Sequence, residues 1–179
     1  MIDLLIVGGG PAGYVAAERA GSAGLKVVLF EKGPMGGVCL NEGCMPTKTL
    51  LYSAKMYENA LSGDKYGVLG DNIRFDYKKM VSRKKKVVRK LVLGVESKMK
   101  SNNVEVIKGE AYINGSSEDG IEITCNDEKY VGKNLLICTG SESSVPPIPG
   151  LKEAGDIIVT NREILEMTER PESLVVIGG

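Results

Sequence analysis

Residues 8–13 form a Gly-x-Gly-x-x-Gly motif, and this motif constrains the fold of the chain more than any other feature. It follows a short apolar run over residues 2–7 and opens an Ala-rich stretch of helical character over residues 14–23. A second apolar run, residues 26–31, completes a strand–helix–strand unit, and such a crossover implies two parallel strands. The sequence therefore predicts an α/β fold of the Rossmann type, built on a parallel sheet.

Each glycine of the motif has a separate physical role. Gly8 permits a tight turn, Gly10 lets the backbone approach a pyrophosphate, and Gly13 lets the helix pack closely on the strand. The helix N-terminus offers unpaired N–H groups and a positive dipole to the phosphates. Glu31 ends the second strand, where a carboxylate binds ribose hydroxyls. We therefore predict a dinucleotide site here; the alternative is a flexible Gly-rich turn.

Two further helices follow a predicted loop over residues 33–43. Apolar residues recur every three or four positions over residues 46–61 and again over residues 76–100, as in an amphipathic helix. The longer helix carries a row of cations: Lys84, Lys85, Lys86, Arg89 and Lys90. Because 23 Lys and Arg residues balance 23 Asp and Glu residues, we predict a solvated helix face and no nucleic-acid partner.

The second half of the chain predicts a small antiparallel β meander beside the parallel sheet. Asn-Gly and Asp-Gly pairs are typical of tight turns between short strands. We expect meander strands at residues 104–107, 112–113, 121–124 and 129–131, followed by a buried strand at residues 135–138. No apolar run approaches the roughly 18 residues of a membrane span, so no membrane association is expected.

The last residues of the chain repeat the pattern of the first. Residues 174–179, Leu-Val-Val-Ile-Gly-Gly, match residues 4–9, Leu-Leu-Ile-Val-Gly-Gly, and predict the first strand of a second nucleotide-binding unit. Before them, residues 160–163 fit a capping box that opens a short helix. We therefore expect one nucleotide-binding domain over residues 1–150, a linker and truncated second domain over residues 151–179, and a longer natural protein.

Two cysteines, Cys39 and Cys44, are separated by four residues that include a glycine. In a regular helix their Cα atoms would be about 8.6 Å apart, beyond the roughly 7 Å limit of a disulfide, so a bridge requires an irregular backbone. A bridge over so short a loop stabilises little, and without a signal peptide a reactive pair is the better explanation. The alternatives are two ordinary thiols, or a zinc site completed by Cys125 and Cys138. We predict no metal site, because the spacing is not Cys-x₂-Cys and the chain has no histidine.

The glycine motif and the cysteine motif together resemble the FAD-dependent pyridine nucleotide–disulfide oxidoreductases. The resemblance rests on residues 8–13, Gly-Gly-Gly-Pro-Ala-Gly, and residues 37–48, Gly-Val-Cys-Leu-Asn-Glu-Gly-Cys-Met-Pro-Thr-Lys. Leu40 and Asn41 look most like the dihydrolipoamide dehydrogenases of that family. It implies that residues 1–150 bind FAD and that an NAD domain begins within residues 151–179. The motifs and the resemblance assign cofactor contacts to Gly8, Gly10, Pro11, Ala12, Gly13, Glu31, Lys32, Gly37, Val38, Lys48, Ala111, Thr139, Gly140 and Ser141.

The resemblance also implies a catalytic role for the cysteine pair. Cys39 would exchange with dihydrolipoamide carried on a lipoyl domain of a 2-oxoacid dehydrogenase or glycine cleavage complex. Cys44 would pass the electrons to FAD, with Lys48 near the flavin, and NAD⁺ would be the final acceptor. The family further implies a cytoplasmic homodimer whose second subunit supplies a histidine base. This chain has no histidine, so by itself it is expected to be inactive.

The chain departs from the family pattern at two positions beside the cysteines. Val38 replaces a common threonine, and Glu42 places a charge where an apolar residue is usual. That charge could raise the pKa of the thiols or alter access to them. Two other functions stay open at this point: a glutathione- or mercuric-ion-type reductase of the same family, and a non-catalytic nucleotide-binding module.

Overall fold

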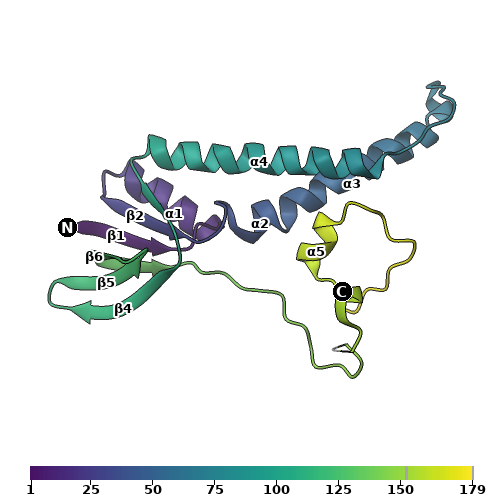
Figure 1. The fold of residues 1–179 in the computed structure, drawn as a ribbon. Helices are drawn as coiled ribbons and strands as arrows, with labels where there is room; N and C mark the ends of the chain where they lie inside the picture. Colours follow the sequence, from purple (N-terminus) through teal and green to yellow (C-terminus); the bar gives the residue numbers. More distant parts are fainter. Residues whose placement is uncertain (152, 179) are drawn as a thin grey trace.

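A computed structural model describes residues 1–151 and 153–178 of the chain. In Figure 1 the sheet lies at one end, α1 and α4 cover one of its faces, and α3 and α4 extend together away from it. The elements are β1 (Ile2–Val7), α1 (Pro11–Ser22), β2 (Val27–Glu31), α2 (Gly37–Asn41), α3 (Cys44–Leu61), the 3₁₀ turn η1 (Asp64–Tyr66), α4 (Tyr77–Ser101), β3 (Glu105–Lys108), β4 (Ala111–Ser117), β5 (Gly120–Cys125), β6 (Glu128–Ile137), the 3₁₀ turn η2 (Gly155–Ile157) and α5 (Asn161–Glu166).

The six strands form one mixed sheet in the order β3-β2-β1-β6-β5-β4. The parallel part contains β3, β2, β1 and the second half of β6, while β4, β5 and the first half of β6 are antiparallel. The predicted α/β fold with a parallel sheet and an antiparallel meander is therefore confirmed. The strand predicted at residues 104–107 is not part of the meander, because residues 105–107 lie in β3, which runs parallel to β2. The long helix α4 carries the chain back along the sheet, so β3 enters in the same direction as β2.

The two strands predicted at residues 129–131 and 135–138 are one ten-residue strand, β6. Gly132 lies at its centre and pairs with Ile2 of β1 on one side and Ile121 of β5 on the other. A Cβ on Gly132 would lie 2.6 Å from the Cγ of Leu5. The glycine is therefore a packing requirement within a continuous strand, and the prediction of two separate strands was wrong.

The two Gly-containing turn signals have different outcomes. The Asp119-Gly120 pair lies at the turn between β4 and β5, as predicted. The Asn114-Gly115 pair lies inside β4, where the register with β5 shifts and Gly115 adopts a φ of +132°. This pair forms a β-bulge, which also uses the left-handed freedom of glycine.

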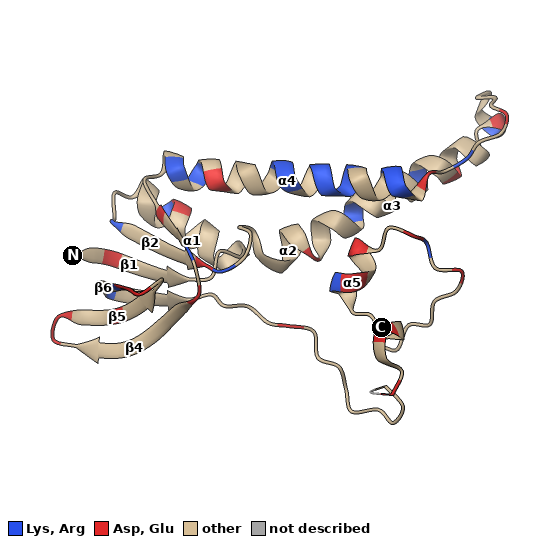
Figure 2. Cartoon of the chain, in the orientation of Figure 1, with Lys and Arg blue, Asp and Glu red and all other residues tan. Residues whose placement is uncertain are grey.

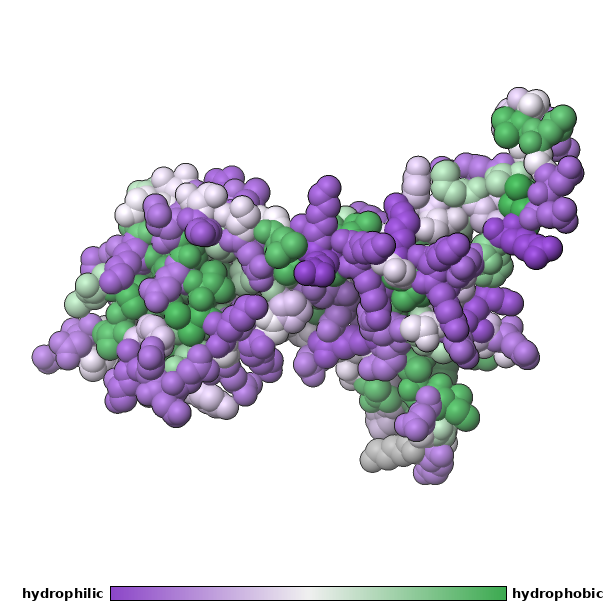
Figure 3. Space-filling view, turned by 45° about the horizontal axis from the view of Figure 1, so that its top comes forward, coloured by the Kyte–Doolittle hydropathy of each residue, from purple (hydrophilic) through white to green (hydrophobic). Residues whose placement is uncertain are grey.

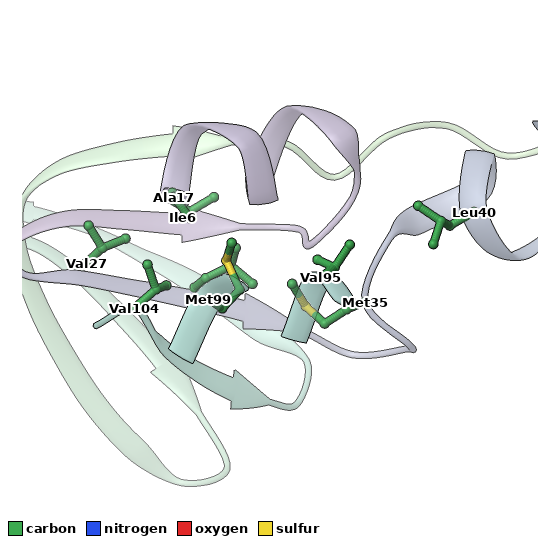
Figure 4. Close-up of a cluster of buried hydrophobic side chains, with 9 residues drawn as sticks. Ile6, Ala17, Val27, Met35, Leu40, Val95, Met99 and Val104 are labelled. Carbon is green, nitrogen blue, oxygen red and sulfur yellow. The ribbon is translucent and has the colours of Figure 1, made fainter. Parts of the chain in front are cut away.

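Both faces of the parallel strands are buried, because alternate residues of each strand point to opposite sides. One face packs against α1 and α4 through the side chains that Figure 4 shows, among them Ile6, Ala17, Val27, Val95 and Met99. The other face holds Leu5, Val7, Val28, Phe30, Ile123 and Cys125. There the ring of Phe30 meets the ring of Tyr130 edge-on, with centroids 5.0 Å apart. The antiparallel strands thus cover the face that carries no helix.

The helices follow the sequence closely, with three corrections. Asp76 caps α4 by accepting a hydrogen bond from the Lys79 N–H at 3.0 Å, as its position before the helix suggests. The predicted loop over residues 33–43 contains the short helix α2, and α3 begins at Cys44, two residues before the predicted start. The third correction concerns Lys84, whose side chain is buried and paired with Glu166. The other four cations of that row are exposed, as predicted, and Figure 2 shows the basic residues along α4.

The segment after β6 runs away from the sheet and returns as α5 beside α2 and α3 (Figure 1). Thr160 and Glu163 form the predicted capping box of α5. Residues 174–177, predicted as a strand, are exposed and pair with no strand in the described part of the chain, and Gly179 lies outside it. A strand needs a neighbouring strand for its backbone hydrogen bonds, and none of the described strands pairs with this segment.

Apolar side chains are exposed at the far end of the α3–α4 pair, where Figure 3 shows a hydrophobic tip. Its residues include Tyr66, Val68 and Leu69, which are 77%, 64% and 84% exposed. Within the described residues, no helix combines the length and the apolar character needed to cross a bilayer.

Candidate functional site

The carboxyl ends of three parallel strands meet at one edge of the sheet and form a pocket. Gly8 follows β1, Glu31 ends β2, and residues 138–141 follow β6. This edge is where open α/β sheets bind ligands. The pocket is lined by Gly8, Gly10, Pro11, Ala12, Glu31, Lys32, Gly33, Pro34, Gly37, Val38, Cys39, Asn41, Glu42, Cys138, Thr139, Gly140, Ser141, Glu142 and Arg162.

The first glycine of the motif lies where the chain turns out of β1. Gly8 has a φ of +106°, and a Cβ there would lie 2.2 Å from the carbonyl oxygen of Cys138. Its N–H donates to the carbonyl oxygen of Phe30 at 2.8 Å, and the Cys138 N–H donates to that of Val7 at 2.7 Å. Because three strand ends are joined here by backbone contacts, only glycine fits this turn.

The second glycine leaves the start of α1 open to the pocket. Gly10 is the N-cap residue, with no side-chain cap, and Pro11 is the first residue of the helix. A Cβ on Gly10 would meet only the Cα of Gly37 within 4 Å, at 3.7 Å. The free first-turn N–H groups and the open space in front of Gly10 suit a phosphate group. Gly37 belongs to a second glycine pair that packs on this loop, since Gly36 donates to the carbonyl oxygen of Gly9 at 2.9 Å.

Glu31 is held in the pocket by two backbone N–H groups. Its Oε2 accepts from Gly9 at 2.6 Å and its Oε1 accepts from Gly33 at 2.7 Å. A carboxylate has about four acceptor positions, so these bonds orient the group and leave capacity for ligand hydroxyls. Lys32 lies beside it, exposed and paired with Glu110 at 3.3 Å.

A break between two helices brings Cys39 and Cys44 together. Cys39 is the third residue of α2 and Cys44 is the first of α3, so the pair is not on one regular helix. Their thiols are free and hydrogen-bonded to each other, with Cys39 half-buried and Cys44 exposed. The hydrogen bond with Cys44 raises the pKa of Cys39, as does burial, while the charge of Lys48 opposes that increase. The pair thus has the contact that reversible disulfide chemistry needs.

The remaining two cysteines lie apart from this pair. Cys125 is buried in the core of the second sheet face, and Cys138 is half-buried at the pocket wall. Burial raises the pKa of each of these thiols. In the part of the chain that the structure describes, no group of three or more His, Cys, Asp or Glu residues is placed to hold a metal ion.

Three of the residues assigned to the cofactor lie outside the pocket lining. Gly13 packs beneath it, where a Cβ would lie 1.8 Å from the carbonyl oxygen of Gly8. Lys48 is exposed on α3, and Ala111 begins β4. Cys44 is likewise outside the lining, whereas Cys39 is part of it.

The pocket also contains residues that the sequence did not assign to it. Gly33, Pro34 and Asn41 reach the pocket from the segment between β2 and α3. Asn41 lies between the two cysteines, so its position in that motif could have indicated a place in the pocket. Its side-chain amide donates to the carbonyl oxygens of Met35 at 3.1 Å and Gly37 at 3.0 Å, which fixes this loop. Arg162 enters the pocket from α5, and no local signal in the sequence connects that helix with the cysteines.

The pocket thus combines a glycine loop suited to a dinucleotide with a neighbouring pair of free cysteines at its rim. The chain belongs to the pyridine nucleotide-disulphide oxidoreductase family, whose model matches residues 2–179. It is 46% identical over 180 residues to a dihydrolipoyl dehydrogenase of Acholeplasma laidlawii, covering 99% of this chain and 52% of that protein. It is 41% identical over 177 residues to a dihydrolipoyl dehydrogenase of Geobacillus stearothermophilus, covering 99% of this chain and 37% of that protein.

The fold is also similar to a solved enzyme structure. The HOCl-induced flavoprotein disulfide reductase RclA from Escherichia coli superposes with a TM-score of 0.74 and 28% identity, over 93% of this chain and 34% of that one. Enzymes of this family use FAD and a pyridine nucleotide. The chain spans about half the length of the Acholeplasma relative and less than two-fifths of the Geobacillus one.

Proposed function

We propose that this chain is the FAD-binding part of a dihydrolipoamide dehydrogenase. Residues 1–150 would bind FAD, and residues 151–179 would lead into the NAD-binding domain. One observation carries the proposal: the free cysteines Cys39 and Cys44 face each other across the α2–α3 link, at the rim of a pocket whose glycine loop suits a dinucleotide. The overall reaction would convert dihydrolipoamide and NAD⁺ into lipoamide, NADH and a proton.

The pocket residues fit FAD by their chemistry. The uncapped start of α1 and the open space at Gly10 suit the pyrophosphate, and the oriented carboxylate of Glu31 suits a ribose. Thr139, Gly140 and Ser141, at the end of β6, supply the other wall of the pocket. FAD held there would take up the electron pair from the cysteines and supply it as hydride to NAD⁺.

The cysteines would carry out the exchange with substrate. A dihydrolipoamide thiolate attacks the sulfur of Cys39 in the oxidised pair, the S–S bond breaks, and Cys44 leaves as a thiolate. The second substrate thiolate then attacks the mixed disulfide, which closes the lipoamide ring and frees Cys39. Two electrons thus pass from the substrate dithiol to the protein pair. Cys44 begins α3, and the dipole of that helix stabilises the leaving thiolate.

The relatives named above support the choice of substrate. We infer that the dihydrolipoamide is carried on a lipoyl domain of a 2-oxoacid dehydrogenase or glycine cleavage complex, that the working enzyme is a homodimer, and that it acts in the cytoplasm.

The test is a turnover assay on the complete protein, combined with mass mapping of its disulfides. We expect bound FAD, a Cys39–Cys44 disulfide that forms in air and opens with dithiothreitol, and NAD⁺ reduction with dihydrolipoamide. Glutathione disulfide and Hg(II), tested with NADH or NADPH, should give no comparable turnover. A disulfide from Cys39 to Cys125 or Cys138, or a preference for either alternative substrate, would contradict the proposal.

A further inference from the structure

Glu42 is the one acidic residue between the two cysteines, and it lies in the two-residue link that joins α2 to α3. A carboxylate close to a thiol disfavours the thiolate, so the placement of the Glu42 charge bears on both cysteines. Its side chain is 39% exposed, so water screens the charge only in part. For the two thiols to ionise readily, the Glu42 carboxylate must either point away from them or be paired with a positive charge.

The first two residues of α5 both bind Glu42. The Nε of Arg162 lies 2.6 Å from the Oε2 of Glu42, and the side-chain amide of Asn161 donates to the Glu42 carbonyl oxygen at 2.9 Å. Carboxylate and backbone are thus held by neighbouring residues of one helix. The second arm of the guanidinium, Nη1, lies 3.5 Å from Glu142.

The opposite end of α5 is fixed to α4. Glu166, the last residue of the helix, pairs with the buried Lys84 through Oε1 and with Lys85 through Oε2 at 3.1 Å. The capping box orders the first turn. Because both ends of α5 have partners, the guanidinium of Arg162 is held against the α2–α3 link and is not a freely moving surface charge.

We propose that Arg162 is a positioning residue, the counter-ion that turns the Glu42 carboxylate away from Cys39 and Cys44 and so keeps the dithiol reactive at neutral pH. The inference rests on the redox role proposed above for the two cysteines. The charged groups that line the pocket together with Cys39 are Glu31, Lys32, Glu42, Glu142 and Arg162, and the charge of Lys48 on α3 also acts on Cys39. Of these, Glu42 and Arg162 make the direct pair.

The two charges predict opposite effects when each is removed. Arg162→Met leaves Glu42 unpaired beside the thiols, so alkylation of the reduced pair by iodoacetamide at pH 7 should slow by about threefold, the effect of one partly screened charge. Glu42→Gln leaves Arg162 free to stabilise a thiolate and should accelerate alkylation by about the same factor. The double variant should return to the wild-type rate, and Arg162→Lys should retain most of it.

A purely structural role makes a different prediction. Each single variant breaks the same contact, so a loosened loop would change both rates in the same direction. The rates are followed at each cysteine by mass mapping across a pH series, with Arg170→Met as the control for loss of an exposed arginine. Equal rates in all variants, or single variants that shift the same way, would overturn the inference.

The outcome also separates this inference from the proposed function. If Cys39 and Cys44 form no reversible disulfide in the wild-type protein, the redox assignment itself fails. If they do and the charge variants behave alike, only the role of Arg162 fails. If Arg162→Met does not fold, the alkylation rates of Glu42→Gln and Arg162→Lys still test the role of Arg162. Faster alkylation in Glu42→Gln and a nearly unchanged rate in Arg162→Lys would support it, and any other pair of results would overturn it.

Discussion

A Cβ on Gly13 would lie 1.8 Å from the carbonyl oxygen of Gly8, so α1 packs directly on the turn that ends β1. Gly13 itself does not line the pocket. Its role is to bring the start of α1 close enough to the strand for the helix to face the pocket. Two glycines of one motif therefore have different roles: Gly13 is required for the stability of the fold, and Gly10 for binding of the cofactor.

Gly13→Ala should destabilise the fold. The added methyl group meets backbone, which cannot move aside as a flexible side chain can, so α1 must shift from β1. We expect the free energy of unfolding to fall by about 3 kcal/mol, the upper end for overpacking. Urea unfolding followed by circular dichroism measures this loss. Gly24→Ala is a poor control because Gly24 has a φ of +84°; Gly94→Ala, with open space around the added Cβ, is the matched one.

Gly10→Val should leave the fold nearly intact and abolish cofactor binding. The new side chain fits beside Gly37 but occupies the space in front of the helix N-terminus. We expect a loss of about 1 kcal/mol in stability, from a poorer N-cap, and a protein that purifies without flavin. Flavin absorbance against protein concentration gives the result. Normal flavin content in a folded Gly10→Val protein would show that the pyrophosphate binds elsewhere.

The sequence predicted the parallel strands β1 and β2 and the helix between them because the signals for these elements are local. Residues 2–31 contain two apolar runs, a glycine motif and a helical stretch, and each signal reports the structure at its own position. The motif also predicted most of the pocket, since Gly8, Gly10 and Glu31 all lie where β1 and β2 end.

The errors arose where a residue's environment depends on distant parts of the chain. Lys84 has the spacing of a solvated cation, and only Glu166, 82 positions later, gives it a buried partner. The strand β6 was predicted as two strands, because nothing local shows that Gly132 lies at its centre and packs against Leu5. The contact of Asn161 with Glu42 spans 119 positions and has no periodicity that could reveal it.

In the reduced, flavin-free protein, Cys44 should be alkylated before Cys39. Cys44 is exposed, whereas Cys39 is half-buried and its pKa is raised by the hydrogen bond with Cys44 and by burial. A smaller fraction of thiolate and a lower accessibility both slow the alkylation of Cys39. Iodoacetamide labelling with mass mapping gives the order. Flavin binding should reverse it if Cys44 lies on the flavin side, as the resemblance implies, and an unchanged order would assign that position to Cys39.

Serine variants of the flavin-loaded protein should separate the roles of the two sulfurs. Cys39→Ser leaves Cys44 as a single thiol at the N-terminus of α3, whose dipole favours the thiolate. We expect long-wavelength absorbance from a thiolate beside the flavin in this variant and none in Cys44→Ser. Both variants should lose dihydrolipoamide turnover, because neither can form the disulfide. Absorbance in Cys44→Ser alone would reverse the two roles.

The anchor of α5 should weaken in acid, and Glu166→Gln should show this. Burial raises the pKa of Glu166, but the hydrogen bonds and charges of Lys84 and Lys85 outweigh that and lower it overall from the ordinary value of 4.5. A lowered carboxyl pKa contributes stability above the unfolded-state value, and that stability is lost as the pH falls through the folded-state value.

At pH 7 we expect Glu166→Gln to lower the free energy of unfolding by about 1 kcal/mol, a modest value because the Glu166 side chain is 55% exposed and its charges are screened. The difference from wild type should shrink as the pH falls below about 4.5, since a protonated Glu166 and a glutamine are then both uncharged. Urea unfolding at a series of pH values measures it, with Glu169→Gln as the control for loss of an exposed carboxylate. A difference that stays constant down to pH 3 would show that the contact stabilises α5 through packing, and that the charge on Glu166 contributes nothing.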